Sequence, residues 1–239
     1  MENTLYIALS HQMAAQRNVE VLANNLANAT SPGFKGDSLM FTEYVEKAGR
    51  GQPISFVRDR AVFHNLTEGS LKRTDNELDV AINGRGWFTV GSNGGELYTR
   101  NGHFHLNQQG QIVTSRGEPV LGENNQPIVI GAEDANVTIA SDGTVSAGAE
   151  VRGKLKIVGF ANEQDLRNVS GGLFRAPAPG EPIAAPTLVQ GSLEESNVQP
   201  IVEMTRMMDA VRTYQQAQKM IDVEHERQRK AIDRLMKTN

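Results

Sequence analysis

The sequence has no cysteine among its 239 residues. This absence excludes a thiol nucleophile, a disulfide framework and a cysteine-ligated zinc site. Aromatic residues make up only 5% of the chain, with a single tryptophan, which is too few for a surface that stacks on bases or sugars. No apolar run approaches the ~18 residues that a membrane-spanning helix needs, so we expect a protein that does not span a membrane.

An excess of positive charge is also lacking, since the net charge is -4 and the isoelectric point is about 5.8. Nucleic-acid partners usually require a basic face, so we expect none. The N-terminus does not resemble a secretory signal, because Glu2 stands where positive charge is expected and the apolar run from Leu5 to Leu9 ends at Ser10. If the protein is exported, we expect export without a cleaved signal peptide.

Motifs of enzymes are lacking as well. The triplet Gly84-Arg85-Gly86 opens no predicted helix, so we interpret it as a turn rather than a dinucleotide loop. His103 and His105 share one face of a predicted strand, but no third ligand is spaced to complete a metal site with them. We therefore predict no catalytic residue, no cofactor and no metal, although a pair of carboxylates that meets only in the folded chain stays an open alternative.

The end of the chain, residues 199–239, predicts one long helix. Its seam has a period near 3.5 residues, with one irregular step after Val211. The seam consists of Ile201, Met204, Met208, Val211, Tyr214, Gln218, Ile221, His225, Gln228, Ile232 and Leu235. Because only part of this seam is apolar, the helix cannot bury much surface in its own domain and needs a partner helix.

The start of the chain, residues 4–28, predicts a second helix. The positions of its seam alternate in steps of three and four without exception: Leu5, Ala8, Gln12, Ala15, Val19, Leu22, Leu26 and Ala29. Pro32 and Gly33 end it. We expect the two terminal helices to pair as a coiled-coil-like unit, with each other or with those of neighbouring subunits. The alternative is two ordinary amphipathic helices packed on a core.

From Leu78 onward the apolar pattern changes to a period of two. Short strands with turns every eight to twelve residues predict a mainly β central domain of antiparallel strands, sandwich or barrel-like. Asn83-Gly84 predicts a hairpin turn between two of these strands. The segments 106–112 and 139–145 share one spacing around a glycine, which indicates the same hairpin used twice.

These patterns divide the chain into four segments. Residues 1–34 form the N-terminal helix of an inner helical domain, and residues 35–74 form an extended transition arm. Residues 75–187 form an all-β outer domain, which ends in a proline-rich linker. Residues 188–239 supply the C-terminal helix that completes the helical domain. Within the arm, we expect a short helix or extended chain first and then two short strands.

Three stretches carry a resemblance to a known family. Residues 24–35 read Asn-Asn-Leu-Ala-Asn-Ala-Thr-Ser-Pro-Gly-Phe-Lys and resemble an ANNLANxxTxGFK signature. Residues 78–88 are similar to an LDVAIxGxGFF segment, with Trp87 in place of its usual Phe, and residues 98–120 continue that similarity. Residues 190–198 resemble a GxLExSNV element. In this order, and over more than half the chain, they resemble the bacterial flagellar axial proteins of the rod, hook and hook-associated type.

The resemblance implies a structural subunit of the flagellar basal-body rod rather than an enzyme. It implies assembly with copies of itself and with other proximal and distal rod subunits, export by the flagellar type III apparatus, and a place in the periplasmic rod. The short chain fits a proximal-rod subunit better than its distal-rod paralogue, which has a longer arm. The alternative from another class is a cell-wall glycan-binding module or enzyme on the β domain.

The helical seams and the first signature together give a set of candidate interface residues. We expect Asn28, Gly33 and Phe34 to set the turn by which the chain leaves the first helix. The full set of candidate subunit-interface residues is Leu5, Ala8, Ala15, Val19, Leu22, Asn25, Leu26, Asn28, Gly33, Phe34, Met204, Met208, Val211, Ile221 and Ile232.

Overall fold

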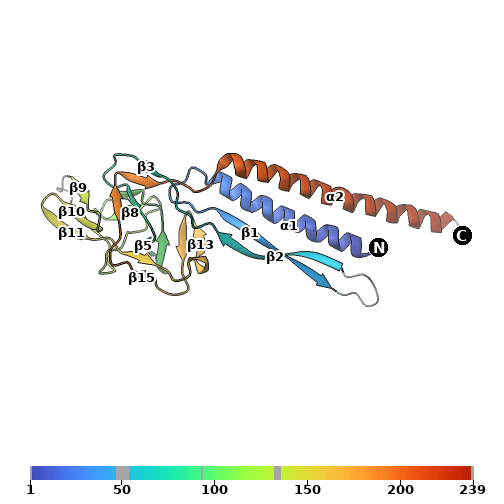
Figure 1. Cartoon of the computed structure of the whole chain (residues 1–239), viewed down its shortest axis with the longest axis horizontal. Helices are drawn as coiled ribbons and strands as arrows, with labels where there is room; N and C mark the ends of the chain where they lie inside the picture. The colour runs from blue at the N-terminus through green and yellow to red at the C-terminus, as the bar shows by residue number, and fades with distance from the viewer. Residues whose placement is uncertain (1, 47–53, 93, 132–135, 238–239) are drawn as a thin grey trace. The chain divides into compact units, whose positions relative to one another are not determined.

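The computed structural model describes residues 2–46, 54–92, 94–131 and 136–237 (Figure 1). The chain folds into two compact units. The first, which we call the helical unit, comprises Met1–Ala27, Asp37–His64 and Val198–Asn239, and the second, the β unit, comprises Asn28–Gly36 and Asn65–Asn197. The middle of the chain is mostly β and a helix lies at each end, as the sequence predicted. Among the described residues, no helix has the length and apolarity to cross a membrane.

This division differs from the four sequence-based segments at each of their boundaries. Residues 28–34, expected to end the N-terminal helical segment, belong to the β unit, as do residues 35–36 and 65–74 of the expected arm. Residues 37–64, expected to belong to a separate arm, are part of the helical unit. Residues 188–197, expected to lead into the final helix, are part of the β unit. The hairpin formed by residues 37–64 packs against the N-terminal helix, whereas the strands of residues 188–197 pair with strands far away in the sequence.

The helical unit consists of α1 (Glu2–Ala27), α2 (Pro200–Lys237) and a hairpin of β1 (Asp37–Glu46) and β2 (Ile54–His64). The two strands pair antiparallel with a bulge between Met40 and Phe41, so β2 is one continuous strand and not the two short strands predicted. The helix α1 packs against α2 and against both strands. Pro200 stands at the first position of α2, where its missing N–H costs nothing.

The buried face of α1 is the seam predicted from the sequence. Ala8, Ala15 and Leu22 are buried at intervals of seven residues, and the seam positions between them are half-buried. Because two of the three buried side chains are alanine, the backbone of α1 lies close to its neighbours.

The buried face of α2 differs from the predicted seam. Glu203, Ala210, Ala217 and Glu224 are buried at intervals of seven, and Met207, Tyr214, Ile221 and Gln228 beside them are half-buried. The seam positions Met204, Met208, Val211 and Ile232 are exposed instead. Small side chains face α1 and large apolar ones face outward, so α1 is not the partner helix of these four residues.

A substitution at the alanine face tests this close packing. We expect Ala15→Leu to destabilise the helical unit by about 1–3 kcal/mol, because a buried face that fits alanine has no room for the three additional carbon atoms of leucine. Ala23→Leu is the matched control, since Ala23 is exposed on the same helix and both residues are good helix formers. Urea unfolding followed by circular dichroism measures both variants, and equal midpoints would contradict the close packing.

The main sheet of the β unit has six antiparallel strands in the order β13-β14-β6-β5-β12-β15. Their bounds are Arg167–Ser170, Leu173–Arg175, Gly95–Thr99, Trp87–Ser92, Ile157–Gly159 and Glu181–Pro182. The last strand lies in the proline-rich segment, so part of the predicted linker belongs to the sheet. Pro182 fits there because β15 is an edge strand, where a missing N–H leaves no inner ladder broken.

Smaller sheets complete the β unit. One has the order β11-β10-β9, with bounds Glu150–Lys154, Thr144–Ala147 and Val137–Ile139, and a 3-10 helix follows at Glu163–Asp165. The remaining pairs are β16 (Leu188–Gln190) with β4 (Val80–Ile82), β17 (Ser192–Glu194) with β3 (Leu71–Arg73), and β7 (Phe104–Leu106) with β8 (Ile112–Thr114).

The turn predicted at Asn83-Gly84 is not a hairpin turn. The strand before it, β4, pairs with β16, whereas the strand after it, β5, pairs with β6 and β12. The loop instead binds the side chain of Arg100, whose guanidinium donates to the carbonyl oxygens of Gly84 at 2.9 Å and Gly86 at 2.6 Å.

The hairpin predicted to occur twice is confirmed. In the first copy, the Asn107 amide donates to the Gln111 carbonyl and the Gly110 amide donates to the Asn107 carbonyl. In the second copy, residues 140, 143 and 144 repeat both bonds. The glycine has a positive φ of 73° in the first copy and 93° in the second, which explains why both carry glycine there.

Apolar side chains cover both faces of the main sheet. Trp87, Tyr98 and Phe174 belong to one buried cluster, whereas the neighbouring Phe88 and Leu97 belong to a second, larger one. Adjacent strand residues point to opposite faces, so the central strands are buried on both sides. This burial makes the β unit a rigid support for the polar residues described next.

Candidate functional site

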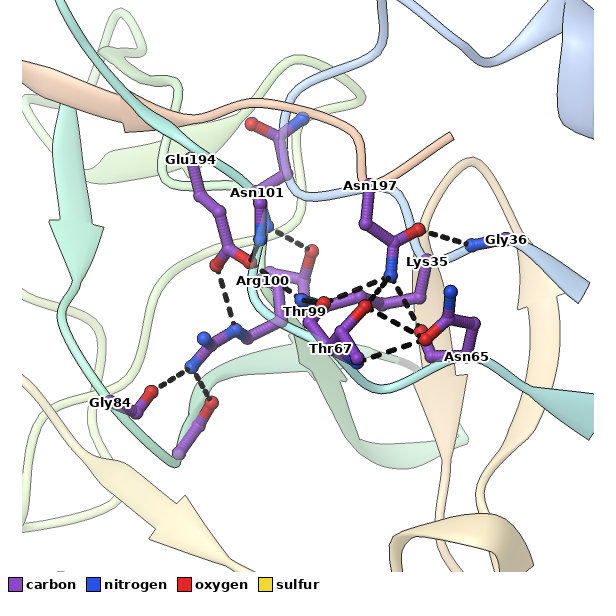
Figure 2. A network of polar contacts seen from close by, with 12 residues as sticks. Lys35, Gly36, Asn65, Thr67, Gly84, Thr99, Arg100, Asn101, Glu194 and Asn197 are labelled. Atoms are coloured by element: carbon purple, nitrogen blue, oxygen red, sulfur yellow. Dashed lines mark hydrogen bonds and ion pairs between the residues drawn. The ribbon is translucent and has the colours of Figure 1, made fainter. Parts of the chain in front are cut away.

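The chain passes between the two units four times, after Ala27, after Gly36, after His64 and after Asn197. On the β-unit side, the ends of the last three of these passages meet in one group of polar side chains (Figure 2). We call this group the crossing cluster, and it consists of Lys35, Asn65, Thr67, Arg100, Glu194 and Asn197.

The centre of the crossing cluster is a buried carboxylate between two buried cations. Glu194 Oε1 lies 2.6 Å from Lys35 Nζ, and Glu194 Oε2 lies 2.9 Å from Arg100 Nε. The three side chains are 1–4% exposed. Burial lowers the pKa of Lys35, and the adjacent Glu194 carboxylate opposes that shift by attraction and by accepting a hydrogen bond. This carboxylate is therefore the only counter-charge that the two cations have in the cluster.

The side chain of Asn197, at the last of these passages, hydrogen-bonds to backbone groups at the two passages before it. Its Oδ1 accepts from the Gly36 amide at 2.9 Å, and its Nδ2 donates to the carbonyl oxygens of Asn65 at 2.7 Å and Thr67 at 2.9 Å (Figure 2). One carboxamide thus forms hydrogen bonds that connect three segments of the chain, each next to a passage between the units. The Lys35 ammonium adds a bond to the Thr67 carbonyl at 2.8 Å.

Gly33 and Phe34, two predicted site residues, lie beside this cluster. The Gly33 amide donates to the Glu194 carbonyl at 2.7 Å, and its φ is +66°. A methyl group at Gly33 would overlap the backbone of Arg100 and Asn101. Phe34 is buried, and its carbonyl accepts from the Asn197 amide. Residues from all three recognised stretches therefore meet at one place.

Asn25 has a comparable role within the helical unit. It is buried on α1, and its Nδ2 donates to the Asp37 carbonyl at 2.7 Å and to Glu203 Oε2 at 3.1 Å. Its Oδ1 accepts from the Asp37 amide at 2.9 Å. One side chain thus ties α1 to β1 and α2, rather than forming a polar outer face at a fraying helix end. Asn28 accepts hydrogen bonds from Ser31 with its backbone and its side chain, which shapes the turn that follows α1.

An apolar surface remains open on α2. Ile201, Met204, Met208 and Val211 follow one another in steps of three, four and three, and they are 36–82% exposed. We call this row the outer stripe. Single exposed apolar residues are ordinary, but a continuous row on one helix face marks an interaction surface. The other predicted helical residues, Leu5, Ala8, Ala15, Val19, Leu22, Leu26 and Ile221, are buried or half-buried.

The sequence patterns missed the buried charges. None of the sequence patterns singled out Lys35, Arg100 or Glu194 as a buried charge. The available signal was the strand alternation at residues 192–194, which points Glu194 and Glu195 to opposite sides. Among the described residues, no group of three histidine or acidic side chains could hold a metal ion, and His103 pairs with Asp79 at 2.7 Å.

Comparison with known protein families gives three matches. Residues 5–35 match the family described as flagella basal body rod protein, and residues 81–147 match the flagellar hook protein FlgE/F/G D1 domain. Residues 189–234 match the flagellar basal body rod FlgEFG protein C-terminal region. The three matches contain the three stretches that meet at the crossing cluster, apart from a few flanking residues.

Full-length relatives agree with these matches. The flagellar basal-body rod protein FlgF of Caulobacter vibrioides is 39% identical over 246 residues and covers 100% of both chains. The protein of the same name from Salmonella typhimurium is 32% identical, over 92% of this chain and 93% of its own. The flagellar basal-body rod protein FlgG of Bacillus subtilis is 31% identical, over 95% and 96%.

Proposed function

Because this chain belongs to the family of flagellar basal-body rod proteins, we propose that its helical unit carries the contacts that join it to neighbouring rod subunits. The protein is a structural subunit of the rod and not an enzyme. FlgF of Caulobacter vibrioides is 39% identical over the whole chain, compared with 31% for FlgG of Bacillus subtilis, so the distal-rod alternative has less support. The family assignment rules out the alternative of a glycan-directed enzyme.

The outer stripe is the observation that carries this proposal. Its four apolar side chains face away from α1, and each contributes about 1.5–3 kcal/mol when it is fully buried. A second helix packed on this row would bury all four. We propose that Met204, Met208 and Val211 act in this way, while the predicted residues of α1 hold α2 in position from its other side. Asn28, Gly33 and Phe34 would hold the exit turn in the shape that the contact needs.

The finer features of the fold belong to the same proposal. We infer that α1 and α2 form a coiled-coil-like pair, which their seven-residue burial intervals support, and that the sheets of the β unit pack as a sandwich. In the rod, the helical unit would supply the inner layer and the β unit the outer one. The neighbours would be copies of this chain and other proximal and distal rod subunits.

The route to the rod is also part of the proposal. We infer export through the flagellar type III apparatus without a cleaved signal peptide, followed by assembly in the periplasm.

A double substitution in the outer stripe tests the proposed function. We expect Met204→Lys with Met208→Lys to abolish swimming when it replaces the wild-type gene, because two buried cations would oppose helix packing between subunits. The matched control is Thr205→Lys with Gln216→Lys, at exposed positions of the same helix outside the stripe. Swimming in soft agar measures the effect. A folded Met204/Met208 variant that swims like the control would contradict the proposal.

A further inference from the structure

We propose that the C-terminal end of α2 of one copy docks into a groove of the next copy. Arg229 of the first copy would form an ion pair with Asp209 of the second. The groove is acidic and lies between α1, β1 and α2, and the docking end is basic and apolar. This inference rests on the proposed role of the helical unit in rod assembly, and it names the surfaces that meet.

The groove is a cavity of about 370 Å³ within the helical unit. This volume corresponds to about a dozen water molecules, so a long side chain fits in it. Leu22 and Ala210 are among its apolar lining residues. Asp37, Glu203, Asp209 and Arg206 are its charged lining residues, so three carboxylates face one guanidinium and two negative charges are in excess. The groove therefore favours a cationic side chain.

The acids of the groove differ in how much they are already engaged. Glu203 accepts from Asn25 and pairs with Arg206 at 2.8 Å, and Asp37 pairs with His64 at 2.5 Å. Asp209 contacts only Arg212 among the pairs of the described residues, at 3.6 Å, and its side chain is 68% exposed. Asp209 at the rim is thus the carboxylate most accessible to a cation from outside.

The docking end reaches beyond α1. The helices run antiparallel, because Gln12 bonds to Gln218 and Asn25 bonds to Glu203. In this register, Glu2 lies opposite about residue 228, so the last turns of α2 pass the start of α1. Figure 1 shows this end of α2 extending past the N-terminus. Nothing on α1 is available to cover it.

The exposed surface of this end has the chemistry that the groove requires. Residues 227–237 contain five basic residues and one acidic residue, a net charge of +4. Arg229, Ile232 and Met236 are spaced by three and four residues and are exposed, so they form one face, which we call the terminal stripe. Arg229 can enter the groove while the two apolar side chains pack beside it.

The two surfaces lie on different sides of α2. Met208 and Arg229 are 21 residues apart, which is three heptads, so the terminal stripe continues the outer stripe. The groove lies on the side of α2 that faces β1 and α1. A contact between two different surfaces of one chain does not close on itself and generates a helical filament. Since Asp209 and Arg229 are 20 residues apart, successive copies would be offset by about 30 Å along α2.

The absence of native cysteine gives a clean test by disulfide cross-linking. We expect basal bodies that contain the Asp209→Cys and Arg229→Cys double variant to yield a ladder of disulfide-linked copies on oxidation. Each single variant should yield no ladder. The matched control is Asp209→Cys with Arg227→Cys, because Arg227 is two residues from Arg229 and therefore lies on nearly the opposite side of the helix. This control should also give no ladder.

Absence of the ladder from basal bodies that contain the double variant would overturn the docking and leave the rod function intact. A wild-type chain absent from purified basal bodies would instead overturn the proposed function. A charge exchange gives a second test that does not depend on cross-linking. We expect Asp209→Arg to abolish swimming and the added Arg229→Asp to restore it. Failure of the second substitution to restore swimming would contradict the docking.

Discussion

Glu194→Gln is expected to destabilise the β unit by about 3–5 kcal/mol, because it leaves Lys35 and Arg100 buried without a counter-charge. The amide keeps the size of the side chain but places an NH2 donor where one carboxylate oxygen faced Lys35 or Arg100, so the loss reports charge and hydrogen bonding rather than volume. This loss is a large part of the 5–15 kcal/mol that stabilises a typical domain. Urea unfolding followed by Trp87 fluorescence measures it, since Trp87 is buried in this unit.

The neighbouring residue supplies the control for this experiment. Glu195 is next in the sequence, but its side chain is 48% exposed and lies 3.9 Å from Lys72. We expect Glu195→Gln to change the free energy of unfolding by less than about 1 kcal/mol, since exposed ion pairs contribute little. If the two glutamine variants unfold at the same urea concentration, the buried charge cluster does not hold the unit together.

Gly33→Ala is expected to have an effect of comparable size, of about 3 kcal/mol or more. Two costs combine at this position. The φ of +66° is unfavourable for any residue with a β-carbon, and the added methyl group would overlap the backbone of Arg100 and Asn101. Since this backbone belongs to the crossing cluster, relief of the overlap would also separate Arg100 from Glu194.

Gly84→Ala separates the two costs at Gly33. Gly84 also has a positive φ, of 99°, but an added methyl group there meets no atom within 4 Å. We therefore expect this control to show only the conformational cost of about 1–2 kcal/mol. Thermal unfolding of both variants measures the difference. Equal losses would show that Gly33 is needed for its backbone angle alone and that the close approach to Arg100 has no energetic consequence.

The helices show which part of a packing pattern a sequence reveals. The seam of α1 was predicted correctly, because its buried positions include Leu22 and are separated from polar positions at every turn. The buried face of α2 was missed, because Glu203, Ala210 and Glu224 carry little hydrophobic signal. The periodicity search found the large apolar side chains of the outer stripe, which face away from α1. The hydrophobic pattern of α2 thus identified an exposed surface of this helix and not the surface that packs against α1.

Strand pairing was predictable only where it is local. The two hairpins around Gly110 and Gly143 were predicted because each depends on a few adjacent residues. The pairing of β4 with β16 joins residues more than one hundred positions apart, and no short pattern encodes such a pairing. The same limit explains the crossing cluster, since its members come from four distant segments. Glu194 and Glu195 look alike in the sequence, and only the strand that contains Glu194 distinguishes the buried carboxylate from the exposed one.

The order in which the parts of the chain are synthesised determines when the helical unit can form. Its two helices come from opposite ends, and the contacts Asn25–Glu203 and Gln12–Gln218 join residues 178 and 206 positions apart. Contacts of such separation form late, because a long loop must close before they are made. The β unit ends at Asn197 and can fold before α2 has been synthesised. The surface that we assign to assembly is therefore completed only after the β unit, and a chain that lacks residues 200–237 cannot present it.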